Sequence, residues 1–144
     1  MAMMPASTQA LEAACIRAID GDTIVALVEG VEEHVRIYGV NAPEKWEPLW
    51  KEAKNLTSAL TSHKTVTLIP KGRDRFGRLL AYVRVDGKTV GLELVARGLA
   101  RVYSNQYAPD DMDTYKAYQQ AQIQAMTETK GIWGGEVLRT ANRR

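Results

Sequence analysis

Two carboxylates flank a glycine in the segment Asp20-Gly21-Asp22-Thr23. Asp-Gly is a common hairpin turn, so this segment taken alone indicates only a turn. Asp22, however, begins the β-rich run that follows, and it could point a carboxylate into a cavity. Carboxylate oxygens are the ligands that Ca²⁺ and Mg²⁺ require. The segment is a candidate metal site only if the fold places other polar side chains next to it.

A second group of polar side chains surrounds the end of a later β-rich run. Arg36 alternates with Val35 and Ile37, so it must face the opposite side of a strand. The run ends in the turn Asn41-Ala42-Pro43-Glu44, which presents Glu44 and the Asn41 side chain near the end that carries Arg36. An outward arginine is commonly only solvated, and a proline turn before a helix is commonly only a turn.

A third group lies in Asp74-Arg75-Phe76-Gly77-Arg78, a glycine-containing turn that delivers Arg78 to the start of a β-rich run. Residues 71–101 include eight basic and three acidic side chains, a net charge of +5 against +2 for the whole chain. Such runs are more often solvated surface, but arginines around Phe76 suit contacts with phosphates and bases. Tyr103 and Tyr107 follow, and they could add stacking faces and hydroxyl groups or simply pack.

Together these groups supply what hydrolysis of a phosphodiester needs. The five-coordinate phosphorus of the transition state is dianionic, and guanidinium groups from Arg36 and Arg78 can bind its oxygens in a bidentate manner. A metal ion held by Asp22 can polarise the phosphoryl oxygen, and Glu44 can take a proton from the attacking water. The three groups predict this chemistry only if one fold brings them together.

The hydrophobic pattern predicts such a fold. Short β-rich runs bounded by turn dipeptides predict strands at residues 14–19, 23–28, 35–40, 65–69 and 79–85. Apolar residues at helical spacing predict a helix at residues 48–62, a short buried helix from Thr89 to Gly98, and a third helix from about Asp110 to Gly131. Five strands with one helix between the third and the fourth is the element order of an OB-fold barrel. The predicted fold is therefore mainly β, of the α+β class, with three α-helices.

Composition excludes several classes of protein. The chain has 144 residues, 45% hydrophobic and 25% charged, which suits one globular domain. No run approaches the roughly 20 apolar residues that span a bilayer, so we expect no membrane segment. One cysteine and two histidines exclude an internal disulfide and a Cys/His zinc site. Any bound metal must prefer oxygen ligands.

We expect three regions along the chain: a flexible leader at residues 1–14, the OB-fold domain at 15–134, and a basic, loose tail at 135–144. The leader lacks the basic and apolar regions of a signal peptide, which favours the cytoplasm. A signal peptide trimmed from the natural protein would instead indicate a secreted or periplasmic location. We expect a monomer, because a small barrel can bury its own core.

From about Cys15 to Trp133, the sequence resembles the staphylococcal nuclease (thermonuclease) family. The order and the spacing of the matching segments both agree with the family pattern. These segments are Ile19–Thr23, Val35-Arg36, Gly39–Glu44, Asp74–Val83 and Leu94–Ala100. Members of the family are small OB-fold, calcium-dependent enzymes that cut DNA and RNA to 3′-phosphate products. The resemblance implies the same fold, cofactor and activity for this chain.

The resemblance also implies a role for individual residues. Arg36 and Arg78 match the phosphate-binding arginines, and Glu44 matches the proposed general base, which makes these three the expected catalytic residues. Asp22 matches a calcium ligand, and Ala42 matches a position that binds calcium through its backbone carbonyl. The implied substrate-binding residues are Arg75, Phe76, Tyr103 and Tyr107.

One metal position departs from the family pattern. The family commonly has aspartate where this chain has Asn41, which keeps an oxygen ligand but loses a charge. Because ligand charge strongly affects calcium affinity, we expect weaker metal binding, with Mg²⁺ or Mn²⁺ as alternatives to Ca²⁺. The leading hypothesis is a metal-dependent nuclease of low sequence specificity that favours single-stranded DNA or RNA. The alternative is a catalytically weak or inactive OB-fold module that binds nucleic acid, a nucleotide or a protein partner.

Overall fold

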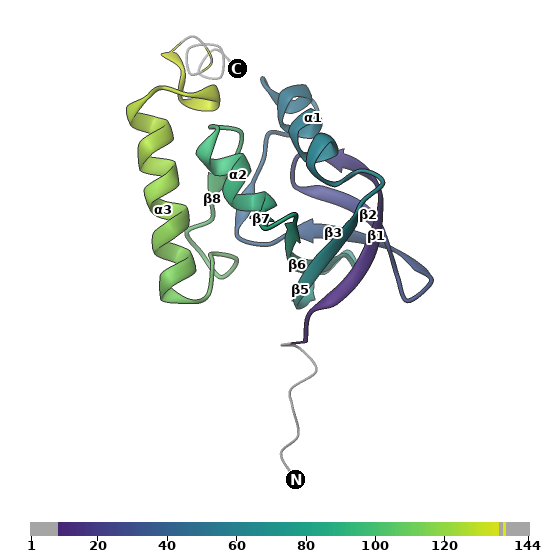
Figure 1. The fold of residues 1–144 in the computed structure, drawn as a ribbon. Coiled ribbons are helices and arrows are strands. Elements are labelled where there is room, and N and C mark those ends of the chain that lie inside the picture. The colour runs from purple at the N-terminus through teal and green to yellow at the C-terminus, as the bar shows by residue number, and fades with distance from the viewer. Residues whose placement is uncertain (1–8, 136, 138–144) are drawn as a thin grey trace.

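A closed, five-stranded β-barrel is the main feature of the computed structural model, which describes residues 9–135 and 137 (Figure 1). Neighbouring strands pair antiparallel in the order β3-β2-β1-β5-β6, and a parallel pairing of β3 with β6 closes the barrel. The barrel strands are β1 (Leu11–Asp20), β2 (Thr23–Val28), β3 (Val31–Ile37), β5 (Thr65–Arg73) and β6 (Leu79–Val85). This closure confirms the predicted OB-type barrel.

The first strand begins earlier than its sequence pattern predicts. Residues 11–14, placed above in a flexible leader, pair with β5 in the register from Leu11↔Leu68 to Ala14↔Thr65. Ala13 is buried whereas Glu12 is exposed, as in a strand with one face on the core. The pairing partner lies about fifty residues away, so local sequence does not reveal it. Most of the expected leader and tail lies outside the described residues.

Three short strands complete the sheet structure. The predicted strand 35–40 is divided in two, because Gly39 has a φ of 89° and breaks the extended chain after β3. The chain then continues as β4 (Val40–Asn41), which pairs antiparallel with β8 (Arg101–Val102). The third short strand, β7 (Lys88–Thr89), extends the sheet beyond β6.

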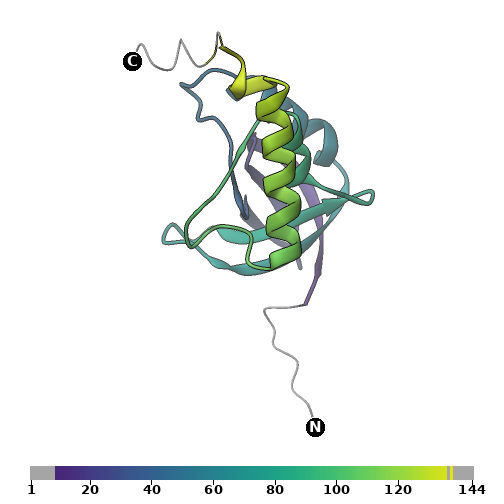
Figure 2. The ribbon, with the colours of Figure 1, turned by 90° about the vertical axis from the view of Figure 1, so that its left-hand side faces the viewer.

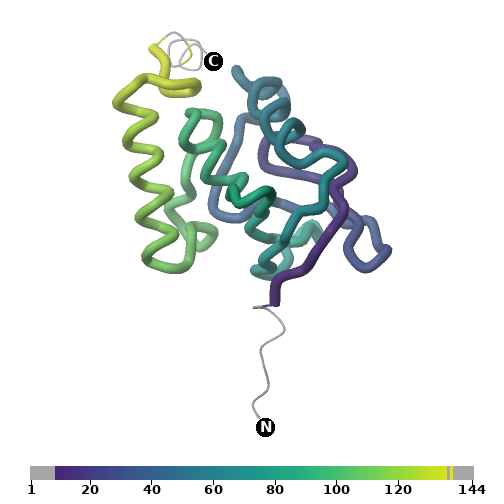
Figure 3. Tube along the Cα trace, viewed as in Figure 1, coloured from purple at the N-terminus to yellow at the C-terminus, as the bar shows by residue number. Residues whose placement is uncertain are grey.

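Among the described residues, three α-helices lie on one side and at one end of the barrel, as Figure 1 shows, and all three were predicted from the sequence. They are α1 (Trp50–Thr61), α2 (Val90–Ala96) and α3 (Met112–Thr127). The Cα trace shows α2 between α3 and the barrel (Figure 3). In the view turned by 90°, α3 runs along the side of the molecule that faces the viewer (Figure 2). Asp111 caps α3 by accepting a hydrogen bond of 2.8 Å from the backbone N–H of Thr114.

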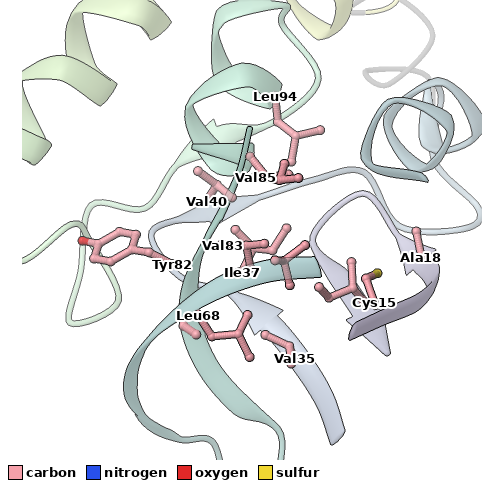
Figure 4. Packing of buried hydrophobic residues seen from close by; sticks show 14 of the residues in the cluster. Cys15, Ala18, Val35, Ile37, Val40, Leu68, Tyr82, Val83, Val85 and Leu94 are labelled. Atoms are coloured by element: carbon pink, nitrogen blue, oxygen red, sulfur yellow. The ribbon is translucent and has the colours of Figure 1, made fainter. Parts of the chain in front are cut away.

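The core fills the barrel and continues beneath α2. Ile37 and Val83 from the barrel and Leu94 from α2 are completely buried, and Figure 4 shows these side chains in one cluster. In β2, Ile24, Val25 and Ala26 are all completely buried, so this strand is covered on both faces. Among the described residues, none of the helices is long and apolar enough to cross a membrane.

The turn between β1 and β2 is held by α1. A Cβ atom at Gly21 would lie 2.8 Å from the Cβ of Ala53, so only glycine fits beneath the helix. The hydroxyl of Thr57 donates a hydrogen bond of 2.6 Å to the carbonyl of Gly21. The helix that follows the Pro43 turn therefore fixes the turn that carries Asp22.

Candidate active site

A buried ion pair joins the first two candidate groups. Asp22 directly precedes β2, and its neighbour Thr23 is the cross-strand partner of Arg36 in β3. The Nη2 atom of Arg36 lies 3.3 Å from Oδ2 of Asp22, and both side chains are at most one-tenth exposed. The antiparallel register of β2 and β3 therefore brings this acid and this base together.

Arg36 also holds the chain between β3 and β4. Its Nη1 atom donates to the carbonyls of Ile37 and Val40 at 2.7 and 2.8 Å. Its Nη2 atom lies 3.3 Å from Oδ1 of Asn41 and 3.2 Å from the hydroxyl of Tyr103. One edge of the guanidinium thus satisfies the backbone, while the other faces the predicted site residues.

The Asp22 carboxylate orders the start of the Pro43 turn. Its Oδ2 atom accepts a hydrogen bond of 2.8 Å from the backbone N–H of Ala42. Burial raises the pKa of Asp22, and this effect exceeds the opposing effects of the Arg36 charge and the Ala42 hydrogen bond. A cation next to this carboxylate would favour its ionised form.

Glu44 lies in an exposed turn that continues from this buried group. Its backbone N–H donates to Oε1 of Glu47, and its carbonyl accepts from the N–H of Glu47, both at 2.8 Å. Desolvation raises the pKa of Glu44, with further increases from the charges of Asp22 and Asp20. The Glu44 carboxylate therefore lies within electrostatic range of the buried pair. A raised pKa makes it a better proton acceptor once it is ionised.

Asp74 holds Arg78 in place. Its Oδ1 atom accepts hydrogen bonds of 2.9 Å from the backbone N–H groups of Phe76 and Arg78, and its Oδ2 atom lies 2.7 Å from Nε of Arg78. Burial alone would raise the pKa of Asp74, but these hydrogen bonds lower it overall. The terminal nitrogens of Arg78 form no hydrogen bond with the described residues, so they can bind an anion.

A cavity of about 390 Å³ collects most of the predicted residues. The predicted site residues that line it are Arg36, Arg75, Phe76, Arg78, Tyr103 and Tyr107. Phe76 is 70% exposed, with the guanidinium carbons of Arg75 and Arg78 at 4.8 and 5.7 Å from its ring centre. The rings of Tyr103 and Tyr107 lie 5.7 Å apart. Guanidinium groups and aromatic faces together form a surface suited to phosphates and bases.

The remaining predicted residues lie beside the cavity rather than in its wall. Asp22, Asn41 and Ala42 are connected to it through the hydrogen bonds and ion pair around Arg36 and Asp22. Glu44 belongs to the same region because the charges of Asp22 and Arg36 both affect its pKa. The fold therefore brings residues from four separate segments into one region.

Three further residues at the site were not assigned a role from the sequence. Asp74 positions Arg78, Tyr38 lines the cavity, and Asp20 accepts a hydrogen bond of 2.7 Å from Nε1 of Trp50 in α1. In turns, an aspartate side chain commonly accepts a hydrogen bond from the backbone N–H two residues further on. The role of Asp74 could therefore have been predicted from the sequence. The contacts of Tyr38 and Asp20 depend on distant segments and had none.

The oxygen donors at the site suit a hard cation in type but only partly in number. Asp22, Asn41 and the Ala42 carbonyl offer the oxygen chemistry that Ca²⁺ prefers. Asp22 and Asn41 each share an oxygen with Arg36. Within residues 9–135 and 137, no group of three or more His, Cys, Asp or Glu side chains could hold a metal ion.

Proteins with similar sequences carry the names endonuclease and thermonuclease. The chain is 35% identical over 119 residues to an uncharacterized endonuclease of Haemophilus influenzae, covering 82% of this chain and 64% of that protein. It is 35% identical over 126 residues to a thermonuclease of Staphylococcus intermedius, covering 81% of this chain and 73% of that protein. Identity to endonuclease YncB of Bacillus subtilis is 37% over 128 residues, covering 81% of this chain and 59% of that protein.

The chain therefore spans somewhat less than two thirds of the Haemophilus and Bacillus relatives. The sequence model described as "Staphylococcal nuclease homologue" matches residues 34–135, which include Arg36, Glu44 and Arg78. This match covers well over half of the chain and extends through the cavity-lining residues. On the combined evidence of its barrel, its arginine-lined cavity and these relatives, the chain belongs to the staphylococcal nuclease homologue family.

Proposed function

We propose that the chain is a metal-dependent nuclease that hydrolyses DNA, RNA or both with low sequence specificity and leaves 3′-phosphate products. The observation that carries the proposal is the cavity in which Arg36 and Arg78 meet the aromatic groups of Phe76, Tyr103 and Tyr107. The endonuclease and thermonuclease names of the relatives support the same reaction class.

In the proposed mechanism, the two arginines bind the phosphate through different atoms. Arg78 offers its terminal nitrogens, because Asp74 occupies only Nε. Arg36 offers Nη2, which would exchange its hydrogen bond with Asn41 or Tyr103 for a phosphate oxygen, because the carbonyls of Ile37 and Val40 occupy Nη1. Fixed donors of this kind stabilise the charge that develops on the phosphoryl oxygens.

Glu44 takes the proton of the attacking water in this proposal. Its raised pKa and its position near Asp22 and Arg36 support this role. Phe76 and the tyrosines offer flat faces to unpaired bases, so we expect single-stranded or frayed nucleic acid to be preferred. Aromatic faces stack on every base, which accounts for low sequence specificity.

The metal would be held by Asp22, Asn41 and the backbone carbonyl of Ala42. When bound, Ca²⁺, or Mg²⁺ or Mn²⁺ in its place, would supply positive charge that polarises a phosphoryl oxygen. We expect the active protein to be a monomer, because a small barrel can bury its own core.

The test is release of acid-soluble nucleotide from heat-denatured DNA by the purified protein, with calcium or with a chelator. Glu44→Gln is the control for contaminating nucleases, because it keeps the shape of the exposed side chain but cannot accept the proton. We expect calcium-dependent release that is lost in Glu44→Gln. Release that persists in this variant would contradict the role of Glu44.

A nucleic-acid-binding module without turnover is the second candidate, favoured by the amide at Asn41 and by its use as an acceptor for Arg36. It predicts that oligonucleotides protect the folded chain from heat or protease. It also predicts that no divalent ion causes release of nucleotide. These two results together would favour the module over the nuclease.

A further inference from the structure

Arg101 lies beside the candidate active site, although it is not part of the cavity wall. Its strand β8 pairs with β4, and Arg101 is the direct cross-strand partner of Asn41. Directly paired residues in an antiparallel ladder place their side chains on the same face. The neighbouring pair, Val40 and Val102, packs toward the core, so the Asn41–Arg101 pair faces outward.

The same face continues to Tyr103. Residues two apart on an extended chain point the same way and are separated by about 6.6 Å. The segment remains extended past β8, because the N–H of Tyr103 donates to the carbonyl of Gly39 at 3.0 Å. Since Tyr103 contacts Arg36, Arg101 lies one repeat further from the cavity along this line. That repeat is comparable to the spacing of successive phosphates on an extended single strand.

The positive charge of Arg101 is ordered but not neutralised. Its guanidinium carbon lies 5.2 Å from the ring centre of Trp133, which restricts its position through a cation–π contact. Within residues 9–135 and 137, no carboxylate forms an ion pair with Arg101. Its cross-strand partner is the neutral amide of Asn41, which cannot pair with its charge.

We propose that Arg101, supported by Trp133, binds the phosphodiester next to the scissile one. This subsite lies beyond Arg36 and Asn41, one repeat of the extended chain from Tyr103. The inference rests on the proposed nuclease function and extends it, because the substrate strand then reaches past the cavity by at least one nucleotide. A guanidinium that is already oriented loses little conformational freedom when it binds a phosphate.

The test compares two labelled ligands, a dinucleotide and a longer oligothymidylate, by fluorescence anisotropy in the presence of a chelator. Arg101→Gln should weaken binding of the oligothymidylate about ten-fold, as expected for one charge-assisted contact. It should also reduce the slope of log affinity against log salt by about 0.7. Dinucleotide affinity should remain unchanged, because its only phosphodiester occupies the scissile position.

Three further variants separate this role from a structural one. Arg84→Gln is the matched control, because it removes an exposed arginine from β6 that lines a different pocket, against α3. It should leave both affinity and salt slope unchanged. Arg101→Lys should restore the salt slope because it retains the charge. Arg101→Met keeps an apolar stem over Trp133, and it carries the test if Arg101→Gln melts below the assay temperature.

Each possible result either supports or overturns the proposed subsite. Weakening of the oligothymidylate alone, with restored salt dependence in Arg101→Lys, supports the subsite. Equal weakening of both ligands overturns it, because Arg101 would then act through Asn41 and Arg36. If wild type binds and cleaves nucleic acid but Arg101→Gln and Arg101→Met behave like Arg84→Gln, the subsite fails and the nuclease stands. If folded wild type neither binds nor cleaves, both proposals fail.

Discussion

Arg36 and Arg78 occupy the same cavity, but the protein holds them in different ways. Arg36 is buried and satisfies two backbone carbonyls, so its removal would leave polar groups unpaired inside the barrel. The Arg78 side chain is about one-third exposed, and within the part of the chain that the structure describes it is held only by Asp74 and the nearby Phe76 ring. A substitution at Arg78 should therefore change activity with less effect on stability than a substitution at Arg36.

We expect Arg78→Lys to lower turnover by about 10²-fold, because an ammonium group cannot reproduce the planar fork that binds two phosphoryl oxygens. The free energy of unfolding should change by less than about 1 kcal/mol, as is usual for partly exposed ion pairs. Steady-state kinetics and urea unfolding measure the two effects. Arg84→Lys, which changes an exposed arginine of β6 that lines a different pocket, should alter neither. Full activity in Arg78→Lys would remove Arg78 from the mechanism.

We expect Asn41→Asp to tighten calcium binding roughly ten-fold, because it adds a carboxylate next to Asp22 without changing the length of the side chain. Titration calorimetry measures the change. Asn41→Ala removes the oxygen altogether, and it should weaken binding in the same assay. Identical calcium affinity in all three proteins would show that residue 41 does not face the metal.

The sequence predicts that several of the proposed site residues lie near the ends of strands, because short turn motifs place them there. Arg75, Phe76 and Arg78 follow from one glycine turn. The structure adds how each group is held, as with Asp74, whose carboxylate accepts two backbone N–H groups. Such contacts depend on the closed geometry of the turn and not on residue type alone.

Among the elements, the segment 103–110 forms one wall of the cavity and is anchored at its far end. The Oδ2 atom of Asp110 lies 2.9 Å from Nζ of Lys71, and its Oδ1 atom accepts a hydrogen bond of 3.3 Å from the hydroxyl of Tyr82. Midway along the segment, the hydroxyl of Tyr38 donates to the carbonyl of Gln106 at 3.3 Å. These contacts connect the segment that carries Tyr103 and Tyr107 to β5, to β6 and to the end of β3.

We expect Asp110→Asn to raise the KM for single-stranded DNA about three-fold with little change in kcat, because the loosened segment presents Tyr103 and Tyr107 less often in the binding position. Steady-state kinetics on an oligonucleotide measures this split. Asp86→Asn is the matched control, since it breaks an exposed ion pair with Lys64 at a different turn. An equal effect from both variants would argue against a positioning role for Asp110.

The long helices could be predicted from the sequence, whereas the pairings of the short strands could not. The predicted helix 48–62 corresponds to α1 (Trp50–Thr61), because its apolar spacing extends over several turns. The two-residue strands β4, β7 and β8 carry no measurable periodicity, so they become visible only through their partners. The early start of β1 has the same cause, since β5 supplies the pairing.

At the scale of the whole molecule, Gly98 and Gly131 lie in close contact and join α2 to the turn that carries Trp133. The N–H of Ile132 donates to the carbonyl of Gly98 at 2.8 Å, immediately after α2. A Cβ atom at Gly98 would overlap the carbonyl oxygen of Lys130 at 2.2 Å. The contact therefore requires glycine, and it positions the turn that carries Trp133 beneath Arg101.

We expect Gly98→Ala to lower the free energy of unfolding by about 3 kcal/mol, because it adds steric overlap to an unfavourable positive φ of 71°. Gly30→Ala is the matched control, because Gly30 has a similar φ of 79° with nothing within 4 Å of its added Cβ. Its cost should be only about 1 kcal/mol. Urea unfolding compares the two, and equal losses would show that the overlap at Gly98 relaxes freely.

The parallel pairing of β3 with β6 has a consequence for the order in which the protein acquires its function. This pairing and that of β1 with β5 both join segments that are far apart in sequence, so we expect both to form late in folding. Arg36 lies in β3 and Arg78 directly precedes β6, so their guanidinium groups meet only when β3 pairs with β6. Under the proposed function, a chain in which this pairing has not formed would be unable to cut nucleic acid, and the return of activity during refolding would report its formation.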